Sequence, residues 1–195
     1  MKKYELTNET KLWFGRTLYR IRALVAFGDV DAGELGGWIE KESNLAQSGD
    51  AWVYGDAWVY GNAQVYGNAQ VFGNARVFGN ARVSGNAWVS GNAWVFGNAR
   101  VYGDARVYGD AEVHKITHYL VIGAIGSRDD FTTFFRTKDK QIFVKCGCFR
   151  GGIDDFVKAV KKTHGGTKHE KTYMLAVELA KAQIEDVENG GAEDA

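Results

Sequence analysis

The sequence contains no proline and only two cysteines, Cys146 and Cys148, among 195 residues. Two cysteines this close together are no disulfide framework of the kind that small secreted proteins use, which suits a reducing compartment. The longest apolar runs, such as residues 119–125, are far too short to span a bilayer. The first residues include two lysines, but no apolar segment of a signal peptide follows them. We therefore expect a cytoplasmic protein that does not enter a membrane.

Net charge is also absent, because lysine plus arginine and aspartate plus glutamate both total 24. Such a chain has no global field that would attract nucleic acid or a membrane surface, so any attraction to phosphates must be local. Apolar residues make up 45% of the chain and aromatic residues 13%. This content is sufficient to bury a core in one or two domains.

Glycine, by contrast, is abundant and follows a strict repeat. It occupies positions 49, 55, 61 and every sixth residue to 109, in the consensus Gly-(Asn/Asp)-Ala-X-Val-(Tyr/Phe/Ser). The alanine and the valine are two residues apart, which places them on the same face of a strand. Gly-Asn and Gly-Asp tolerate positive φ and suit a corner. Each hexad therefore predicts a short strand with Ala and Val inward and X outward, followed by a corner.

A six-residue unit cannot bury its own apolar face, so successive hexads must stack into a solenoid. The spacing of Val53 with Ala57, and of Val59 with Ala63, resembles the hexapeptide-repeat family, in which a small residue follows an aliphatic residue by four positions. One departure is that the residue after the aliphatic position is here mostly aromatic. The resemblance implies a left-handed parallel β-helix with three hexads per coil, an exception to the usual right-handed crossover.

The segments before the repeats are expected to cover one open end of the solenoid, where unpaired strand edges would otherwise promote aggregation. Ile39 and Leu45 keep the inward phase of the repeats, which predicts a degenerate coil beginning near Gly37. Residues 11–24 predict a strand pair that turns near Gly15. The side chains available to plug the core are Leu18, Ile21 and Leu24.

The segments after the repeats predict a small α+β domain. A strand is expected at 117–125, a hairpin at 132–136 with 141–146, and a helix that starts at Ile153 and stops at Gly165–Gly166. A second helix is expected at about 170–187, with the apolar stripe Tyr173, Val177, Ala180 and Ile184. The predicted organisation is an N-terminal cap at 1–47, a left-handed β-helix of eleven hexads at 48–114, a small α+β domain at 115–187 and a disordered acidic tail at 188–195.

The outward X residues form three unlike columns when they are read every eighteen residues. Neighbours in a column are expected about 4.8 Å apart, the spacing of paired strands. Arg76 is therefore expected between the rings of Trp58 and Trp94, where each cation–π contact contributes about 0.5–2 kcal/mol. The columns are Trp52, Gln70, Trp88 and Arg106; Trp58, Arg76, Trp94 and Glu112; and Gln64, Arg82 and Arg100. Corner columns add Tyr54, Phe72 and Tyr108; Tyr60, Phe78 and Phe96; and Tyr66 and Tyr102.

Stacked aromatics beside arginines can hold a base, a nucleotide or a protein partner. A structural alternative is that ladders of like side chains only stabilise the stacked coils, with some faces covered by the flanking domains or by a second subunit. The exposed tryptophans favour a homo-oligomer, a trimer or a dimer. The predicted partner-binding residues are Trp52, Trp58, Arg76, Arg82, Trp88, Trp94, Arg100 and Arg106.

The C-terminal segment has two weaker candidate sites. Cys146 and Cys148 with the later His164 and His169 do not have the usual zinc spacing, and we expect half-buried cysteines that close the small sheet rather than a metal site. A phosphate pocket is the second candidate, although scattered arginines are more often solvated. Its residues are Ser127, Arg128, Arg136 and Arg150. No cofactor is predicted.

Enzymes of the hexapeptide family transfer acyl groups from coenzyme A, using a histidine placed by a loop that interrupts the coils. Here the hexads are uninterrupted and no histidine precedes His114 within them, so the sequence predicts no catalytic residue and no enzyme. The flanking segments RTLYRIRALVAFGDVDAGELGGWIE and IGSRDDFTTFFRTKDKQIFVKCGCFRGGIDDFVKAVKKTHG also resemble uncharacterised phage and prophage proteins, often labelled hexapeptide-repeat or polymer-forming. That resemblance implies a viral or prophage source and no established activity.

Three functions follow as hypotheses. The first is a noncatalytic binding protein that uses the aromatic and arginine faces of the β-helix to bind, and to inhibit, a host macromolecule in the host cytoplasm. A host protein is the expected partner, with a nucleotide or nucleic acid as the alternative. The second is a small-ligand binder that sequesters a nucleotide, and the third is a hexapeptide-repeat acyltransferase.

Overall fold

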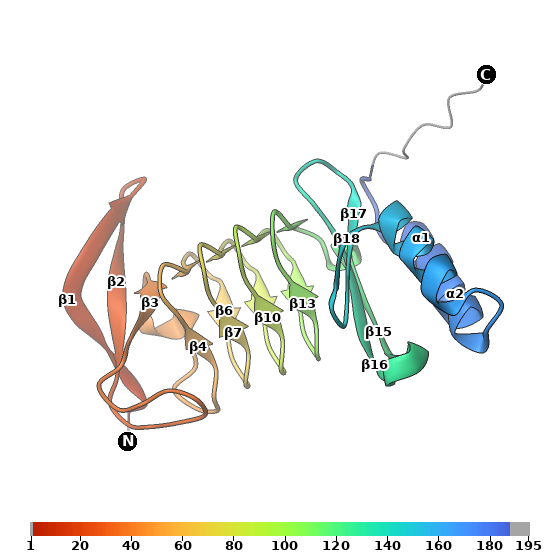
Figure 1. The fold of residues 1–195 in the computed structure, drawn as a ribbon. Helices are drawn as coiled ribbons and strands as arrows, with labels where there is room; N and C mark the ends of the chain where they lie inside the picture. Colours follow the sequence, from red (N-terminus) through yellow and green to blue (C-terminus); the bar gives the residue numbers. More distant parts are fainter. Residues whose placement is uncertain (1, 188–195) are drawn as a thin grey trace. The chain divides into compact units, whose positions relative to one another are not determined.

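The computed structural model describes residues 2–187 and divides the chain into two compact units, Met1–Ile116 and Thr117–Ala195. The predicted cap and the hexads fall into the first unit, and the strands and helices that follow form the second (Figure 1). The tail predicted at 188–195 lies outside the described residues. Among the described helices, none is long and apolar enough to cross a membrane.

The hexads form a β-solenoid of two-residue strands, each made of the X and valine positions (Figure 1). The prediction of one strand and one corner in every hexad is confirmed. The strands are β4 (Trp52–Val53), β5 (Trp58–Val59), β6 (Gln64–Val65), β7 (Gln70–Val71), β8 (Arg76–Val77), β9 (Arg82–Val83), β10 (Trp88–Val89), β11 (Trp94–Val95), β12 (Arg100–Val101), β13 (Arg106–Val107) and β14 (Glu112–Val113).

Strands that lie three hexads apart pair in parallel and build three sheets. The strand orders are β5-β8-β11-β14, β4-β7-β10-β13 and β6-β9-β12. The register does not change along the solenoid: Val59 pairs with Val77, and Val77 pairs with Val95. Three hexads therefore make one coil, as the resemblance implied.

The interior of the solenoid consists of stacked alanine and valine side chains. Every repeat alanine and valine from Ala51 to Val113 is at most 2% exposed, which confirms the predicted inward phase. The corner glycines have φ values between 56° and 71°. At Gly79 an added Cβ would also lie 3.0 Å from the Gly97 nitrogen of the next coil. Both the positive φ and the close approach of the coils therefore require glycine there.

An antiparallel hairpin of β1 (Tyr4–Trp13) and β2 (Arg16–Ala23) precedes the solenoid, and β2 pairs with β3 (Leu35–Ile39). β3 runs parallel to β5, so the hairpin extends one solenoid sheet to seven strands. The predicted strand pair is confirmed, but its first strand begins at Tyr4 instead of near residue 11. The added residues are mostly polar and show no clear apolar alternation, so periodicity did not reveal them.

Four side chains predicted to face the core are buried: Leu18, Ile21, Ile39 and Leu45. Leu24 is 42% exposed, so its predicted role as a plug is wrong. Ala23 takes the inward position at the end of β2, and successive side chains point to opposite faces of a strand, which turns Leu24 outward.

The N-terminal edge of the solenoid has carbonyl groups that no preceding coil can satisfy, and polar side chains of the cap donate to them. Lys3 Nζ donates to the Ala51 carbonyl at 2.8 Å, and the Asn44 side-chain amide donates to the Ala63 carbonyl at 2.8 Å. Burial lowers the pKa of Lys3 to about 8, against the opposing effect of the Asp50 charge. The N-terminal segment therefore both covers the apolar core and satisfies carbonyl groups at the end of the solenoid.

The second unit is a four-stranded antiparallel sheet, in the order β15-β16-β17-β18, with α1 and α2 against it (Figure 1). The predicted strand, hairpin and two helices are all present. β18 was not predicted, because the two glycines of Phe-Arg-Gly-Gly are unfavourable in a strand. The elements are β15 (Tyr119–Ile125), β16 (Asp130–Arg136), β17 (Ile142–Cys146), β18 (Phe149–Gly152), α1 (Ile153–His164) and α2 (Lys168–Gln183).

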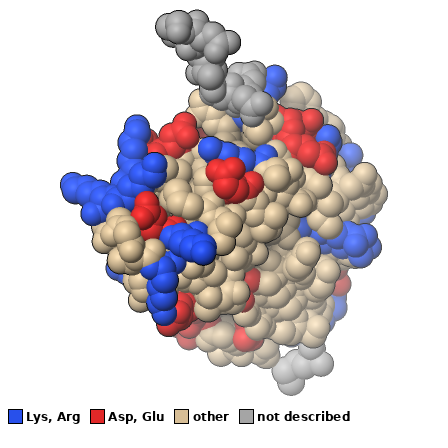
Figure 2. Space-filling view, turned by 90° about the vertical axis from the view of Figure 1, so that its right-hand side faces the viewer, with Lys and Arg blue, Asp and Glu red and all other residues tan. Residues whose placement is uncertain are grey.

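The core of this unit lies between the sheet and the two helices. The predicted stripe of the second helix is buried, although α2 ends at Gln183 and Ile184 packs from just beyond it. Figure 2 shows one face of the molecule, on which lysine and arginine are interspersed with aspartate and glutamate. The core side chains include Phe134, Val144, Phe156, Val160, Tyr173, Val177 and Ala180.

Candidate binding surface

The sheet that contains β5, β8 and β11 carries the densest group of outward aromatic side chains. Its outward positions are the X residue of each strand and the residue two positions later, which lies on the same side of an extended chain. We call this surface the aromatic face, and it consists of Trp58, Tyr60, Arg76, Phe78, Trp94 and Phe96.

Arg76 lies at the centre of the aromatic face among three indole rings. Its guanidinium carbon is 4.5 Å from the ring centre of Trp58 and 5.5 Å from that of Trp94, which confirms the predicted bracket. A third ring, Trp13 of β1, lies 4.7 Å away. Contacts of this kind contribute about 0.5–2 kcal/mol each, so the rings hold this long side chain in place.

Three further rings stack beside this arginine. The ring centres of Tyr60 and Phe78 are 5.0 Å apart, and those of Phe78 and Phe96 are 4.9 Å apart, with planes inclined by 2° and 4°. Phe78 also meets the edge of Trp94 at 6.1 Å. The distances match the separation of paired strands, which is why residues eighteen apart can stack. The aromatic face is therefore an ordered array before any partner binds.

A hollow of about 290 Å³ lies beside the ring ladder. It combines apolar rings, amides and cations: Arg16, Lys41, Tyr60, Asn62, Phe78 and Asn80. Arg16 pairs with Glu40 at 2.8 Å, and Lys41 donates to Asn62 at 3.3 Å. Both cations come from the N-terminal segment, so the cap and the repeats build this part of the surface together.

The contribution of the hairpin to this surface was not predicted from the sequence. The rings of Trp13 and Trp58 meet at 5.1 Å, and Lys11 Nζ lies 4.1 Å from the ring centre of Trp38. The only signal was the cluster Lys-Leu-Trp-Phe before Gly15. Repeat spacing could not show which solenoid sheet the hairpin would extend, so it could not place these residues.

The second face, formed by β4, β7, β10 and β13, differs along its length. Trp88 is 40% exposed, and the Arg106 guanidinium carbon lies 4.4 Å from its ring centre. Trp52, in the same column, is fully buried, because Tyr4 and Phe27 meet its ring edge-on at 6.0 and 5.3 Å. The prediction that Trp52 lies on a binding surface is therefore wrong, since the N-terminal segment covers it.

The third face presents arginines. Arg82 and Arg100 are exposed and directly paired in register between β9 and β12. Like charges opposite each other in a sheet repel, so this pair is a local concentration of positive charge rather than a stabilising contact. Tyr66 and Tyr102, on the same face, are exposed as well.

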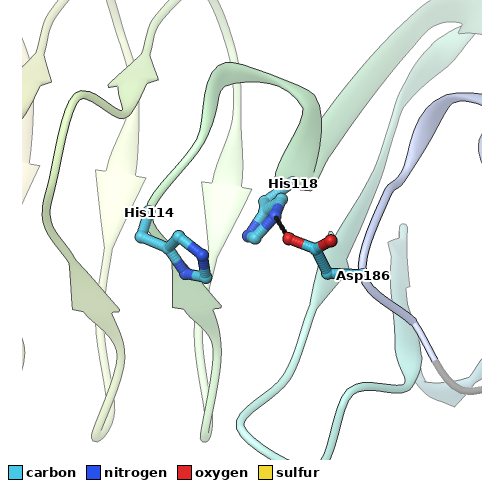
Figure 3. Close-up of side chains that lie close together, drawn as sticks. All are labelled: His114, His118 and Asp186. Carbon is cyan, nitrogen blue, oxygen red and sulfur yellow. Dashed lines mark hydrogen bonds and ion pairs between the residues drawn. The ribbon is translucent and has the colours of Figure 1, made fainter.

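The four residues predicted for one phosphate pocket do not come together. Ser127 and Arg128 line a cavity in the second unit, but Arg136 and Arg150 do not. Arg136 is buried and donates from Nε to the carbonyl of Asp186 at 3.0 Å, while His118 Nε2 lies 3.3 Å from the Asp186 carboxylate (Figure 3). Arg136 thus fastens the segment after α2 to the sheet, and its assignment to a phosphate pocket is wrong.

The cysteines lie at the hairpin between β17 and β18. Cys146 is half-buried, whereas Cys148 is exposed, so only the first matches the expected pair of half-buried cysteines. Both line the cavity that also contains Ser127 and Arg128, and His164 reaches it from α1. Within residues 2–187, these two thiols do not join His164 and His169 in a group of metal ligands.

Comparison with known proteins locates similarity in the solenoid. A family described as the YdcK β-solenoid repeat matches residues 69–83, 75–91, 81–97 and 99–115. The repeats are of the hexapeptide β-solenoid type. The uncharacterized acetyltransferase YdcK of Escherichia coli (strain K12) is 39% identical over 62 residues, which cover 28% of this chain. The alignment spans 19% of that relative, so the chain matches about a fifth of its length.

Proposed function

We propose that this chain is a noncatalytic binding protein whose aromatic face engages a protein partner. The observation that carries the proposal is the position of Arg76 among the indoles of Trp13, Trp58 and Trp94, with a ladder of stacked rings beside it. Arginine, tryptophan and tyrosine are the residues that most often dominate the binding energy of protein interfaces. On the aromatic face they are contiguous and partly exposed.

The rigidity of the solenoid supports the same proposal. Trp58 and Arg76 lie in strands that are hydrogen-bonded to their neighbours, as at Arg76 N to Ala93 O (2.9 Å) and Trp58 N to Ala75 O (2.9 Å). The stacked rings are carried by the residues that directly follow the strands of this sheet. A partner that binds such an array does not have to order flexible loops, and this lowers the entropic cost of association. The hollow beside Tyr60 and Phe78 gives a partner side chain a place to insert.

We further propose that the partner is a host macromolecule and that the chain is encoded by a phage or prophage and acts in the host cytoplasm. The support is the resemblance of both flanking segments to phage and prophage proteins. Covering a host protein with a rigid face would inhibit it without any chemistry.

Two tryptophans offer a matched test of the binding face. Trp94 on the aromatic face and Trp88 on the second face are 43% and 40% exposed and occupy the same position in successive hexads. We expect Trp94→Ala to weaken partner binding by about 2 kcal/mol, or about thirtyfold in Kd, because residues at the centre of an interface carry most of its energy. Trp88→Ala is the control and should change Kd less than threefold. The measurement is calorimetry with the protein that the parent captures from lysate.

Two further results bear on this test. Equal losses in Trp94→Ala and Trp88→Ala would contradict a single binding face. Arg82→Glu with Arg100→Glu reverses the charge of the third face and should leave binding intact; loss of binding there would move the site to that face. Light scattering gives the particle mass of the parent and of Trp94→Ala. If the partner is a second copy of the chain, the parent should have a larger mass than the variant.

The relative named an acetyltransferase favours a second candidate, acyl transfer from coenzyme A. The similarity lies in the repeats, and across residues 49–113, all of which the structure describes, the strands recur every six residues with no inserted loop and no histidine. We therefore expect no heat of binding when acetyl-coenzyme A is titrated into the protein. The same titration with a nucleotide panel tests the sequestering alternative. Saturable binding of acetyl-coenzyme A at micromolar concentration would replace the proposed function with the enzyme.

A further inference from the structure

A cavity of about 170 Å³ opens in the C-terminal unit between the β17–β18 hairpin and the two helices. At about 30 Å³ for each water in the liquid, it has room for roughly six non-hydrogen atoms. Its inner wall is apolar and aromatic, and its mouth carries a thiol, a hydroxyl and a guanidinium group. The wall includes Ile125, Phe149, Phe156, Val160 and Tyr173, and the mouth includes Ser127, Arg128 and Cys148.

The hairpin places Cys148 against a cation. Arg128 Nη1 lies 3.4 Å from the Cys148 sulfur. The residue between the two cysteines is Gly147, with φ +54°, where an added Cβ would lie 3.0 Å from the same Arg128 nitrogen. Glycine at this turn therefore supplies the backbone conformation and the space that let the guanidinium reach the thiol.

The electrostatic surroundings favour the thiolate form. The hydrogen bond and charge of Arg128 lower the pKa of Cys148 below its usual value, and Lys145 and Arg150 add to this effect. Asp130 also lines the cavity and is the opposing charge nearby. Thiolate is the nucleophilic form of cysteine, and exposed cysteines beside arginine or lysine are the reactive ones.

Cys146 differs from Cys148 although it lines the same cavity. Its sulfur accepts from Thr132 Oγ1 at 3.2 Å and lies 3.6 Å from the hydroxyl of Tyr173. Burial, followed by the contact with Cys146, raises the pKa of Tyr173 to about 12, so this hydroxyl stays protonated at neutral pH. Cys146 is therefore held between two hydroxyl groups, and the chain contains its own control thiol.

We propose that this cavity is a thiol–disulfide exchange site at which Cys148 forms a mixed disulfide with a small, anionic disulfide. The Cys148 thiolate attacks one sulfur of the reagent, the S–S bond of the reagent breaks, and a new S–S bond joins Cys148 to one half of it. The other half leaves as a thiolate and takes a proton from water. The anionic group of the bound half would face Arg128, and its carbon chain would enter the aromatic cavity.

Two small disulfides of opposite charge test the proposal on the full chain. Dithiodiglycolate is anionic, cystamine is cationic, and each half of either reagent is small enough for the cavity. At neutral pH and low salt we expect dithiodiglycolate to modify Cys148 about tenfold faster than Cys146. We expect cystamine to show much less preference for Cys148 over Cys146. Intact mass and peptide mapping identify the modified residue.

Arg128→Gln should slow modification of Cys148 by dithiodiglycolate about tenfold and slow cystamine less, because it removes the cation and keeps a polar side chain. Cys146→Ser should retain the adduct and Cys148→Ser should lose it. Raising the salt concentration should also remove the preference of dithiodiglycolate for Cys148. This test uses the unaltered protein, so it does not depend on the folding of a variant. Modification of Cys146 and Cys148 by dithiodiglycolate at equal rates, or the same preference for Cys148 with both reagents at low salt, would overturn the proposal.

Discussion

Val77→Asp is expected to cost about 4 kcal/mol or more of the free energy of unfolding. Val77 is fully buried between Val59 and Val95, its partners in the neighbouring coils. A carboxylate there would have neither water nor a hydrogen-bond donor, and burying an unpaired charge is among the most destabilising changes known. Urea unfolding followed by circular dichroism measures the loss.

Gln64→Asp is the control for this prediction, because it introduces the same carboxylate at an exposed X position. It should change the free energy of unfolding by no more than about 0.5 kcal/mol. If Val77→Asp had the same urea midpoint of unfolding as the control, within experimental error, the valines would not face the core.

Trp52→Ala is expected to lose about 3–5 kcal/mol of stability, as large aromatic truncations in cores do. Its ring is enclosed by Tyr4 and Phe27, and the Cβ of an alanine at Gly36 would come 2.7 Å from it. Removing the indole therefore leaves a cavity between the cap and the first coil. The loss should be accompanied by faster proteolysis in the segment between β2 and β3, which Phe27 would no longer anchor.

Trp88→Ala removes the same side chain from the same column, but from a partly exposed site. It should cost about 1 kcal/mol or less, since truncations of partly exposed side chains are mild and the ring, which contacts Arg106 and Phe72, is 40% exposed. If the two tryptophan variants unfolded at the same urea concentration, the N-terminal segment would not cover Trp52 in solution.

The solenoid could be predicted from the sequence because its determinants are local and repeated. One hexad predicts the inward alanine and valine and the glycine at each corner, and its repetition predicts the eighteen-residue coil. The coil length then predicts that Trp58 and Trp94 bracket Arg76. The helices of the second unit were visible for the same reason, because Tyr173, Val177 and Ala180 have helical spacing. Periodicity, wherever it was present, gave the right element and the right inward face.

The parts of the site that could not be predicted depend on non-repeating segments. Trp52 and Trp88 are equivalent in the hexad, but Tyr4 and Phe27 of the non-repeating N-terminal segment cover Trp52, whereas Trp88 stays partly exposed. Trp13 joins Arg76 through the register of the hairpin, which no periodic signal encodes. The same holds for Arg128, whose approach to Cys148 depends on a single glycine turn.

Oxidative footprinting of tryptophans in the unaltered protein shows whether a partner covers the aromatic face. The oxidation rates of Trp94 and Trp88 are compared with and without a saturating amount of the captured partner. Both rings start from similar exposure, so a difference reports which face is covered. We predict that the partner slows oxidation of Trp94 severalfold and leaves Trp88 unchanged. Protection of Trp88 with Trp94 still fully reactive would mean that the partner does not bind the aromatic face.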